Sequence, residues 1–163
     1  MSTQVSRRSL EIQAWVGLLR THAAVTRQLD RELVEEHGLT INDYEVLLHL
    51  SRADDRMMRR VDLANRVLLT PSGITRLLDG LERGGLVEKA SCSTDARVVY
   101  AKLTGKGLKR LESASESHLA SVRGLFAERF SEEELESLAS YLARLPQAPG
   151  TAEECTPPSQ TES

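Results

Sequence analysis

The sequence predicts a mainly α-helical protein with one small β-hairpin. Helix breakers are few: 10 Gly and 5 Pro occur in 163 residues, and three of the prolines lie in the last fifteen residues. Apolar residues recur at helical spacing in several long segments. Only the neighbouring segments 86–90 and 98–103 are rich in branched residues, and the turn-like SCSTDAR separates them. A chain of this length with 40% hydrophobic residues suits one domain.

The first helix is expected over residues 10–37, and residues 1–9 are expected to be a flexible N-terminus. Its apolar groups recur at helical spacing over many turns, at Trp15, Leu18, Leu19, His22, Val25, Leu29 and Leu33. Gly38 follows at the position where a left-handed residue ends a helix. Thr40 then caps a second helix, which has Asp43 in its first turn and runs to about Ser51.

The middle of the chain contains two short helices. A polar loop with a short strand at 57–59 leads into a helix at 61–69. Thr70 and Pro71 start the next helix as N-cap and first helical residue. Its buried stripe is Ile74, Leu77, Leu78 and Leu81, and two glycines at 84–85 end it.

The C-terminal part is again helical. After the hairpin, Thr104 caps a helix of about 26 residues. Ser131 and Glu134 then form a capping box for a last helix, which ends at Pro146. Residues 147–163 are rich in Pro, Ser, Thr and Glu, and we expect a disordered tail there.

The charge is segregated along the chain although the net charge is only −3. Residues 56–110 contain twelve basic and five acidic residues, a net of +7, while the remainder carries −10. A basic centre favours a local anionic partner such as nucleic acid, and an ordinary solvated face is the alternative.

The composition also excludes several classes of protein. No apolar run is long enough to span a bilayer, and the N-terminus lacks the apolar core of a signal peptide, so no membrane partner is expected. Cys92 and Cys155 are too few and too far apart for a disulfide framework or a zinc cluster. A reduced cytoplasmic setting is therefore expected, with no cofactor and no metal.

The two short central helices have the order of a helix-turn-helix. Burial of the Ile74 stripe leaves Ser72, Gly73, Thr75 and Arg76 on other faces. Small and hydroxyl residues allow a close approach to base edges, and Arg76 suits guanine or a phosphate. The helix N-terminus at Thr70 and Pro71 favours a phosphate as well.

The hairpin supplies a second set of candidate contacts. Arg97 follows Asp95 by two residues, a spacing that lets the carboxylate pair with the guanidinium and orient it. Arginine suits a narrow, electronegative minor groove. Lys89 and Lys102 flank the loop as candidate phosphate contacts. A helix-turn-helix followed by a basic hairpin is typical of a winged helix.

The run from Leu63 to Gly107 resembles the MarR family of bacterial transcription regulators. The matching segments are TPSGITRLLDGLERGGLVEK and DARVVYAKLTGKG, and the helical order extends the resemblance to about residues 10–145. The family pattern of an Asp-x-Arg, an aliphatic-x-Leu-Thr and a glycine falls on Asp95, Arg97, Leu103, Thr104 and Gly107. Departures include Lys89 in place of a frequent arginine and Ala101 in place of a common valine.

The resemblance implies a homodimer whose terminal helices interlock and place two recognition helices about one DNA turn apart on a pseudo-palindrome. We therefore expect dimerisation helices at 10–39 and 104–146, and a winged helix-turn-helix DNA-binding region at 40–103. The expected activity is repression by binding double-stranded DNA, relieved by a small aromatic or phenolic effector. The family's effector pocket would be lined by Trp15, His22, Tyr44 and His49, for which filling the core is the simpler interpretation.

Other functions remain as alternatives. His22 and His118 lie on apolar stripes and could hold a metal, and Cys92 could be a redox sensor, although packing and an inert thiol are simpler. A helical dimer that mediates protein–protein contacts is a further alternative. The chain has no serine elbow, metalloprotease motif or phosphate loop, so an enzyme is not expected.

Overall fold

The computed structural model describes residues 2–67, 69–91, 95 and 97–146, with side chains from residue 9 onward. In chain order these residues form α1 (Ser2–His37), α2 (Ile41–Arg52), the short 3-10 helix η1 (Asp54–Arg56), β1 (Met57–Arg59), α3 (Arg60–Arg66), α4 (Pro71–Arg83), β2 (Val87–Ser91), β3 (Val99–Leu103), α5 (Gly105–Ala127) and α6 (Glu132–Ala143). The predicted fold class, mainly α-helical with a small hairpin, is confirmed. The strand order is β1-β3-β2 and both pairings are antiparallel.

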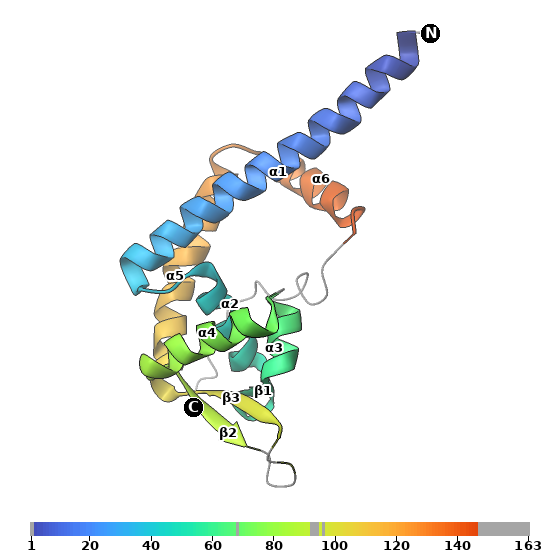
Figure 1. The fold of residues 1–163 in the computed structure, drawn as a ribbon. Helices are drawn as coiled ribbons and strands as arrows, with labels where there is room; N and C mark the ends of the chain where they lie inside the picture. Colours follow the sequence, from blue (N-terminus) through green and yellow to red (C-terminus); the bar gives the residue numbers. More distant parts are fainter. Residues whose placement is uncertain (1, 68, 92–94, 96, 147–163) are drawn as a thin grey trace.

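The elements form two parts joined by α5. Figure 1 shows α5 running from the three-stranded sheet to the opposite end of the molecule, where α1 and α6 lie. The helices α2, α3 and α4 lie around the sheet, and α1 projects beyond the rest of the molecule. The core is centred on α2 and joins both parts, because its fully buried side chains lie on or beside α1, α2, α3, α4 and α5. These side chains are Leu33, Leu39, Val46, Leu47, Leu50, Leu63, Ile74 and Leu111.

Local sequence signals explain where the helices begin. Four predicted N-cap side chains each accept a hydrogen bond from the backbone N–H three residues later. These are Thr40 from Asp43 (3.1 Å), Thr70 from Gly73 (3.1 Å), Thr104 from Gly107 (3.0 Å) and Ser131 from Glu134 (3.3 Å). Each cap contributes about 1 kcal/mol to helix stability.

The start of α5 is bonded to the turn after α4. The Thr104 hydroxyl donates to the carbonyl of Gly85 (2.7 Å), and its backbone N–H donates to the carbonyl of Leu86 (3.1 Å). Lys106 Nζ donates to the carbonyl of Gly84 (2.9 Å). Gly85 has a φ of +72°, which favours glycine and ends α4 as predicted. The long helix is therefore fixed to the end of α4 and to the sheet.

Several boundaries differ from the sequence prediction. The helix α1 begins at Ser2 and so includes most of the segment 1–9 that we expected to be flexible. Residues 2–9 contain no Pro or Gly, so nothing in the sequence stops the helix there. The helix α5 has 23 residues instead of about 26, and α6 ends at Ala143 before Pro146. The predicted disordered tail at 147–163 and Cys92 lie outside the described residues.

Candidate nucleic-acid interface

The N-terminal turn of α4 presents small polar side chains beside a buried stripe. Ser72 and Arg76 are exposed, while Ile74 is 1% exposed and anchors the helix to the core. A Cβ on Gly73 would lie 3.1 Å from Thr70 Oγ1, so glycine permits the close packing of the cap. The predicted contacts Ser72 and Arg76 are therefore available on the surface of the molecule.

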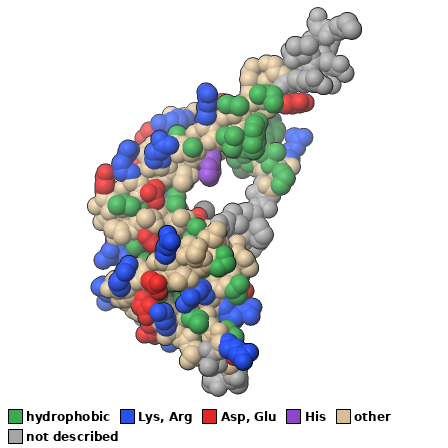
Figure 2. Space-filling view, in the orientation of Figure 1, with side chains coloured by type: hydrophobic (Ala, Val, Ile, Leu, Met, Phe, Trp, Pro, Cys, Tyr) green, Lys and Arg blue, Asp and Glu red, His purple; other side chains and the backbone are tan. Residues whose placement is uncertain are grey.

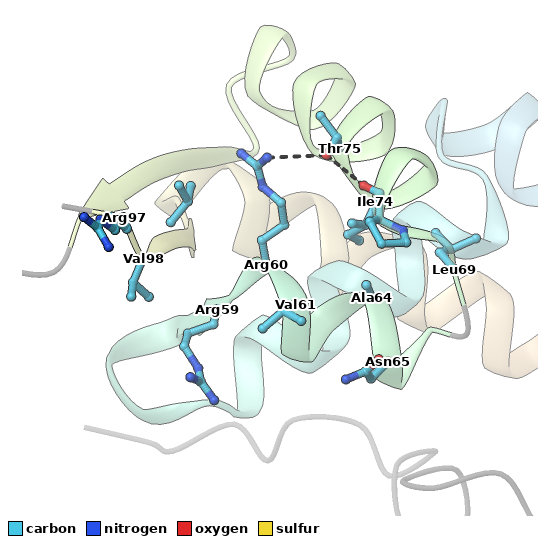
Figure 3. A pocket seen from close by; sticks show the side chains of 12 residues that line it. Arg59, Arg60, Val61, Ala64, Asn65, Leu69, Ile74, Thr75, Arg97 and Val98 are labelled. Atoms are coloured by element: carbon cyan, nitrogen blue, oxygen red, sulfur yellow. Dashed lines mark hydrogen bonds between the residues drawn. The ribbon is translucent and has the colours of Figure 1, made fainter. Parts of the chain in front are cut away.

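The hydroxyl of Thr75 is already engaged inside the protein. Its Oγ1 donates to the carbonyl of Pro71 at 2.8 Å, as Figure 3 shows. The same oxygen accepts a hydrogen bond of 3.4 Å from Nη1 of Arg60, the first residue of α3. Arg60 was not predicted as a site residue. The one sequence feature that points to it is the pair of adjacent arginines, Arg59 and Arg60, at the start of the first short helix.

A groove of about 450 Å³ separates α3, α4 and the start of β3. Its apolar lining includes Val61, Ala64 and Ile74, and its charged lining includes Arg60 and Arg97. Figure 3 shows Arg97 at the hairpin side of this groove and the Arg60 side chain reaching across to Thr75. The structure thus places the predicted recognition helix and the predicted wing on one groove.

The hairpin turn differs in detail from the prediction. Asp95 Oδ1 accepts a hydrogen bond from the backbone N–H of Arg97 at 2.9 Å. The bond shapes the backbone of the turn, as Asp side chains commonly do. The expected pairing between the Asp95 carboxylate and the Arg97 guanidinium is not among the ion pairs of the described residues.

The two predicted lysine contacts are paired with carboxylates. Lys89 Nζ lies 3.1 Å from a carboxylate oxygen of Glu82 and 3.9 Å from one of Asp79. Lys102 Nζ lies 4.0 Å from Glu88. These exposed pairs are weak, yet each carboxylate offsets some of the positive charge that a phosphate would meet. Lys89 and Lys102 therefore offer a phosphate less uncompensated positive charge than the sequence prediction implied.

The four predicted effector-binding residues occupy different environments. Trp15 and His22 are exposed on α1, and Trp15 retains 58% of its accessible surface. Tyr44 and His49 are buried in α2. The Tyr44 ring lies 4.8 Å from the His118 ring, between centroids, and its hydroxyl is 3.1 Å from Ser115 Oγ. In the single chain, the two α1 residues are therefore exposed and the two α2 residues are buried, so the four do not line one pocket together.

Polar atoms are buried where α1, α2 and α5 meet. His118 Nδ1 is buried and has no hydrogen-bond partner among the described residues, and Glu32 Oε2 is buried beside it. Burial lowers the pKa of His118 from its ordinary value, so the neutral imidazole is favoured. Hydrogen bonding with the Gln28 amide and, second, with the Ser121 side chain lowers the pKa of the Glu32 carboxyl.

Apolar side chains are exposed on the terminal helices. Large hydrophobic residues of α1 and α6 retain between 37% and 62% of their accessible surface: Leu10, Ile12, Trp15, Leu18, Leu19, Val34, Tyr141 and Leu142. Figure 2 shows apolar side chains gathered where α1 crosses α6, and Lys and Arg side chains spread over the part that contains α4 and the sheet. No residue of α6 is buried in the single chain.

Metal-binding clusters and membrane-spanning helices are both absent from the residues that the structure describes. They contain no group of three or more His, Cys, Asp or Glu side chains that could hold a metal ion. None of their helices combines the length and the apolar character needed to cross a membrane.

Comparison with known proteins identifies similar regulators. A family model described as MarR family matches residues 37–98. The transcriptional regulator MhqR of Bacillus subtilis is 26% identical over 134 residues, which cover 82% of this chain and 90% of the relative. The regulator FarR of Neisseria gonorrhoeae is 31% identical over 116 residues, covering 71% and 75% of the two chains.

Solved structures agree with these relatives. AbsC, a MarR family regulator from Streptomyces coelicolor, is 34% identical with a TM-score of 0.74, covering 82% of this chain and 89% of that chain. Sco3205, a MarR family regulator of the same organism crystallised in complex with DNA, is 25% identical with a TM-score of 0.78, covering 91% and 93%.

Proposed function

Because the chain belongs to the MarR family of transcriptional regulators, we propose that it is a homodimeric repressor that binds a pseudo-palindromic operator. The chain is a DNA-binding transcription regulator with a winged helix-turn-helix.

One observation carries the proposal: α4 and the hairpin border the same groove with different chemistry. The α4 side offers exposed Ser72 and Arg76 beside a capped helix N-terminus. The hairpin side offers Arg97, which has no carboxylate partner among the described residues. In the proposed complex α4 enters the major groove and reads base edges, while Arg97 enters the adjacent minor groove.

The dimer is supported by the exposed apolar surface of α1 and α6. Contiguous apolar surface of this kind is uncommon on a monomer and marks an interface. A second copy that packs against these helices would present two α4 helices to one face of DNA. That symmetry gives two half-sites, and binding on one face of the duplex requires them to lie about one helical turn apart, roughly 34 Å, or a multiple of it.

We further propose that a small aromatic or phenolic compound releases the DNA. The buried Nδ1 of His118 has no partner among the described residues, and it lies near the Glu32 carboxylate and the Tyr44 ring, which supports a polar binding site at the junction of α1, α2 and α5. Such a ligand acts only through a difference in its affinity for the DNA-bound and released arrangements. The proposed role is one of binding and not of catalysis, and it belongs in the cytoplasm, where bacterial DNA lies.

Selection of bound sequences from a random DNA pool tests the repressor proposal directly. We expect one enriched pseudo-palindrome, and Arg97→Ala should weaken binding to all sequences and reduce the slope of log affinity against log salt by about 1. Arg129→Ala is the matched control, because Arg129 lies just after the far end of α5, beside Glu128.

Failure of the parent chain to bind any DNA at low salt would refute the proposal and favour a protein-interaction module. Parental affinity of Arg97→Ala at every salt concentration would refute only the role of the hairpin.

A further inference from the structure

Arg60 occupies the centre of the groove between the two helices of the helix-turn-helix and the hairpin. It is the first residue of α3, and its side chain extends toward α4, as Figure 3 shows. The same side chain lines both the main groove and a smaller neighbouring pocket bounded by β2 and β3. The partly buried Arg60 side chain therefore borders α4, β2 and β3 at once.

The donors of Arg60 are poorly satisfied in the free protein. Its Nη1 makes a long bond of 3.4 Å to the Thr75 hydroxyl, and its Nε is buried with no partner among the described residues. None of the ion pairs of these residues includes Arg60. A buried charged donor without a partner is costly, so an incoming anion would be favoured at this position.

The neighbouring cations, in contrast, are paired with carboxylates. Arg59 Nε donates to Asp62 at 2.7 Å, and this carboxylate raises the pKa of the arginine. Lys89 is held by Glu82 at 3.1 Å. Arg60 is thus a cation of this interface whose charge no described carboxylate offsets, and its planar donors suit phosphate oxygens.

Arg60 also constrains what Thr75 can offer to a base. The Thr75 hydroxyl hydrogen is used on the Pro71 carbonyl, and Arg60 occupies one lone pair of the same oxygen. The remaining groups are one acceptor lone pair and the methyl group. An acceptor suits the amino groups of adenine and cytosine, and a methyl group suits the thymine methyl.

We propose that Arg60 is a specificity-determining residue that binds a DNA phosphate and fixes the hydroxyl of Thr75 as an acceptor. The inference rests on the proposed function, because it assigns Arg60 a role in the same DNA complex. It separates two effects: a charge effect common to all sequences, and a base preference transmitted through Thr75.

A cycle of variants tests both effects on the operator selected with the parent chain. The variants are Arg60→Met, Thr75→Val, the double variant, and Arg59→Met as the matched control. Arg60→Met should reduce affinity roughly tenfold, which is the size expected for one charge-assisted hydrogen bond, and reduce the salt slope by about 1. Arg59→Met should change both quantities by less, because Asp62 already pairs with that side chain.

The base preference provides the sharper result. Arg60→Met should relax the preference at one position of each half-site, and Thr75→Val should relax the same position. In the Thr75→Val background, Arg60→Met should change the salt slope and leave the preference unchanged, since no hydroxyl is left to orient.

A structural role for Arg60 is distinguished by two further measurements. Arg60→Met should keep the melting temperature of the parent, because it removes a buried donor that has no partner. Arg60→Lys retains the positive charge and should keep the salt slope while losing the base preference. Parental affinity, slope and preference in Arg60→Met would overturn the inference while the proposed repressor function stands. A parent chain that selects no DNA would overturn both.

Discussion

Gly107 lies in the first turn of α5 against the backbone that precedes β2, and its replacement by alanine should strongly destabilise the fold. A Cβ at this position would lie 2.0 Å from the carbonyl oxygen of Leu86 and 2.8 Å from a methyl carbon of Leu103. Separations below 3.0 Å essentially never occur for a Cβ, so α5 and Leu86 must separate by about 1 Å.

The energetic cost follows from what that movement breaks. Inserting a methyl group into a packed site costs about 1–3 kcal/mol. The same Leu86 carbonyl accepts the backbone N–H of Thr104 at 3.1 Å, and loss of this bond adds about 1 kcal/mol. We expect Gly107→Ala to lose about 2–4 kcal/mol in total, which corresponds to a melting temperature lower by roughly 4–16 °C.

Gly105→Ala is the matched control, because a Cβ at Gly105 meets nothing within 4 Å. Alanine there should raise the free energy of unfolding by about 0.4–1 kcal/mol through the smaller entropy of the unfolded chain. Urea unfolding followed by circular dichroism measures both variants, at one fixed protein concentration because a dimer's stability depends on it. A loss below about 1 kcal/mol in Gly107→Ala would refute the argument from close packing.

Three further outcomes are expected. Lys89→Met should reduce the salt slope of DNA binding by less than Arg97→Ala does, since Glu82 already pairs with the lysine; equal reductions would contradict this. Burial lowers the pKa of His118 from its ordinary 6.5, so its contribution to stability is present above about pH 6.5 and is lost as the pH falls through the folded-state pKa. His118→Gln should therefore flatten the pH dependence of the free energy of unfolding below pH 6.5, and an unchanged slope in urea titrations would oppose the assignment. Trp15→Asp should raise the dimer dissociation constant at least roughly tenfold in sedimentation experiments, because it places a charge on an apolar surface; an unchanged constant would place the interface elsewhere.

The helix starts were predictable because their causes are local. Thr40, Thr70, Thr104 and Ser131 each cap a helix through a backbone amide three residues away, so the signal lies within one turn of the chain. The start of α1 was placed too late because its apolar stripe begins later than its helical backbone. Periodicity reports which residues face a partner, and it does not report how far the helix extends beyond that face.

The candidate interface was predictable in outline only. The order of helix, helix and hairpin follows from capping and from branched residues, which are again local features. The pairing of Lys89 with Glu82 depends on how β2 packs beside α4, and the bond from Arg60 to Thr75 depends on how α3 packs beside α4. Contacts between separate elements produce no regular residue spacing in the sequence. The role of Arg60 was therefore not predicted, and the free positive charge of Lys89 and Lys102 was predicted to be larger than it is.

The fixed joint at Thr104 makes α5 a lever between the two ends of the molecule. Its 23 residues span about 35 Å at 1.5 Å per residue. The end of α1 holds it near the joint, where Arg110 donates to the His37 carbonyl at 2.6 Å. A tilt of about 5° over that length displaces one end by about 3 Å, close to the 3.4 Å rise of one base pair. A small rotation of the terminal helices can therefore shift the DNA-binding part by almost one base-pair step along the DNA.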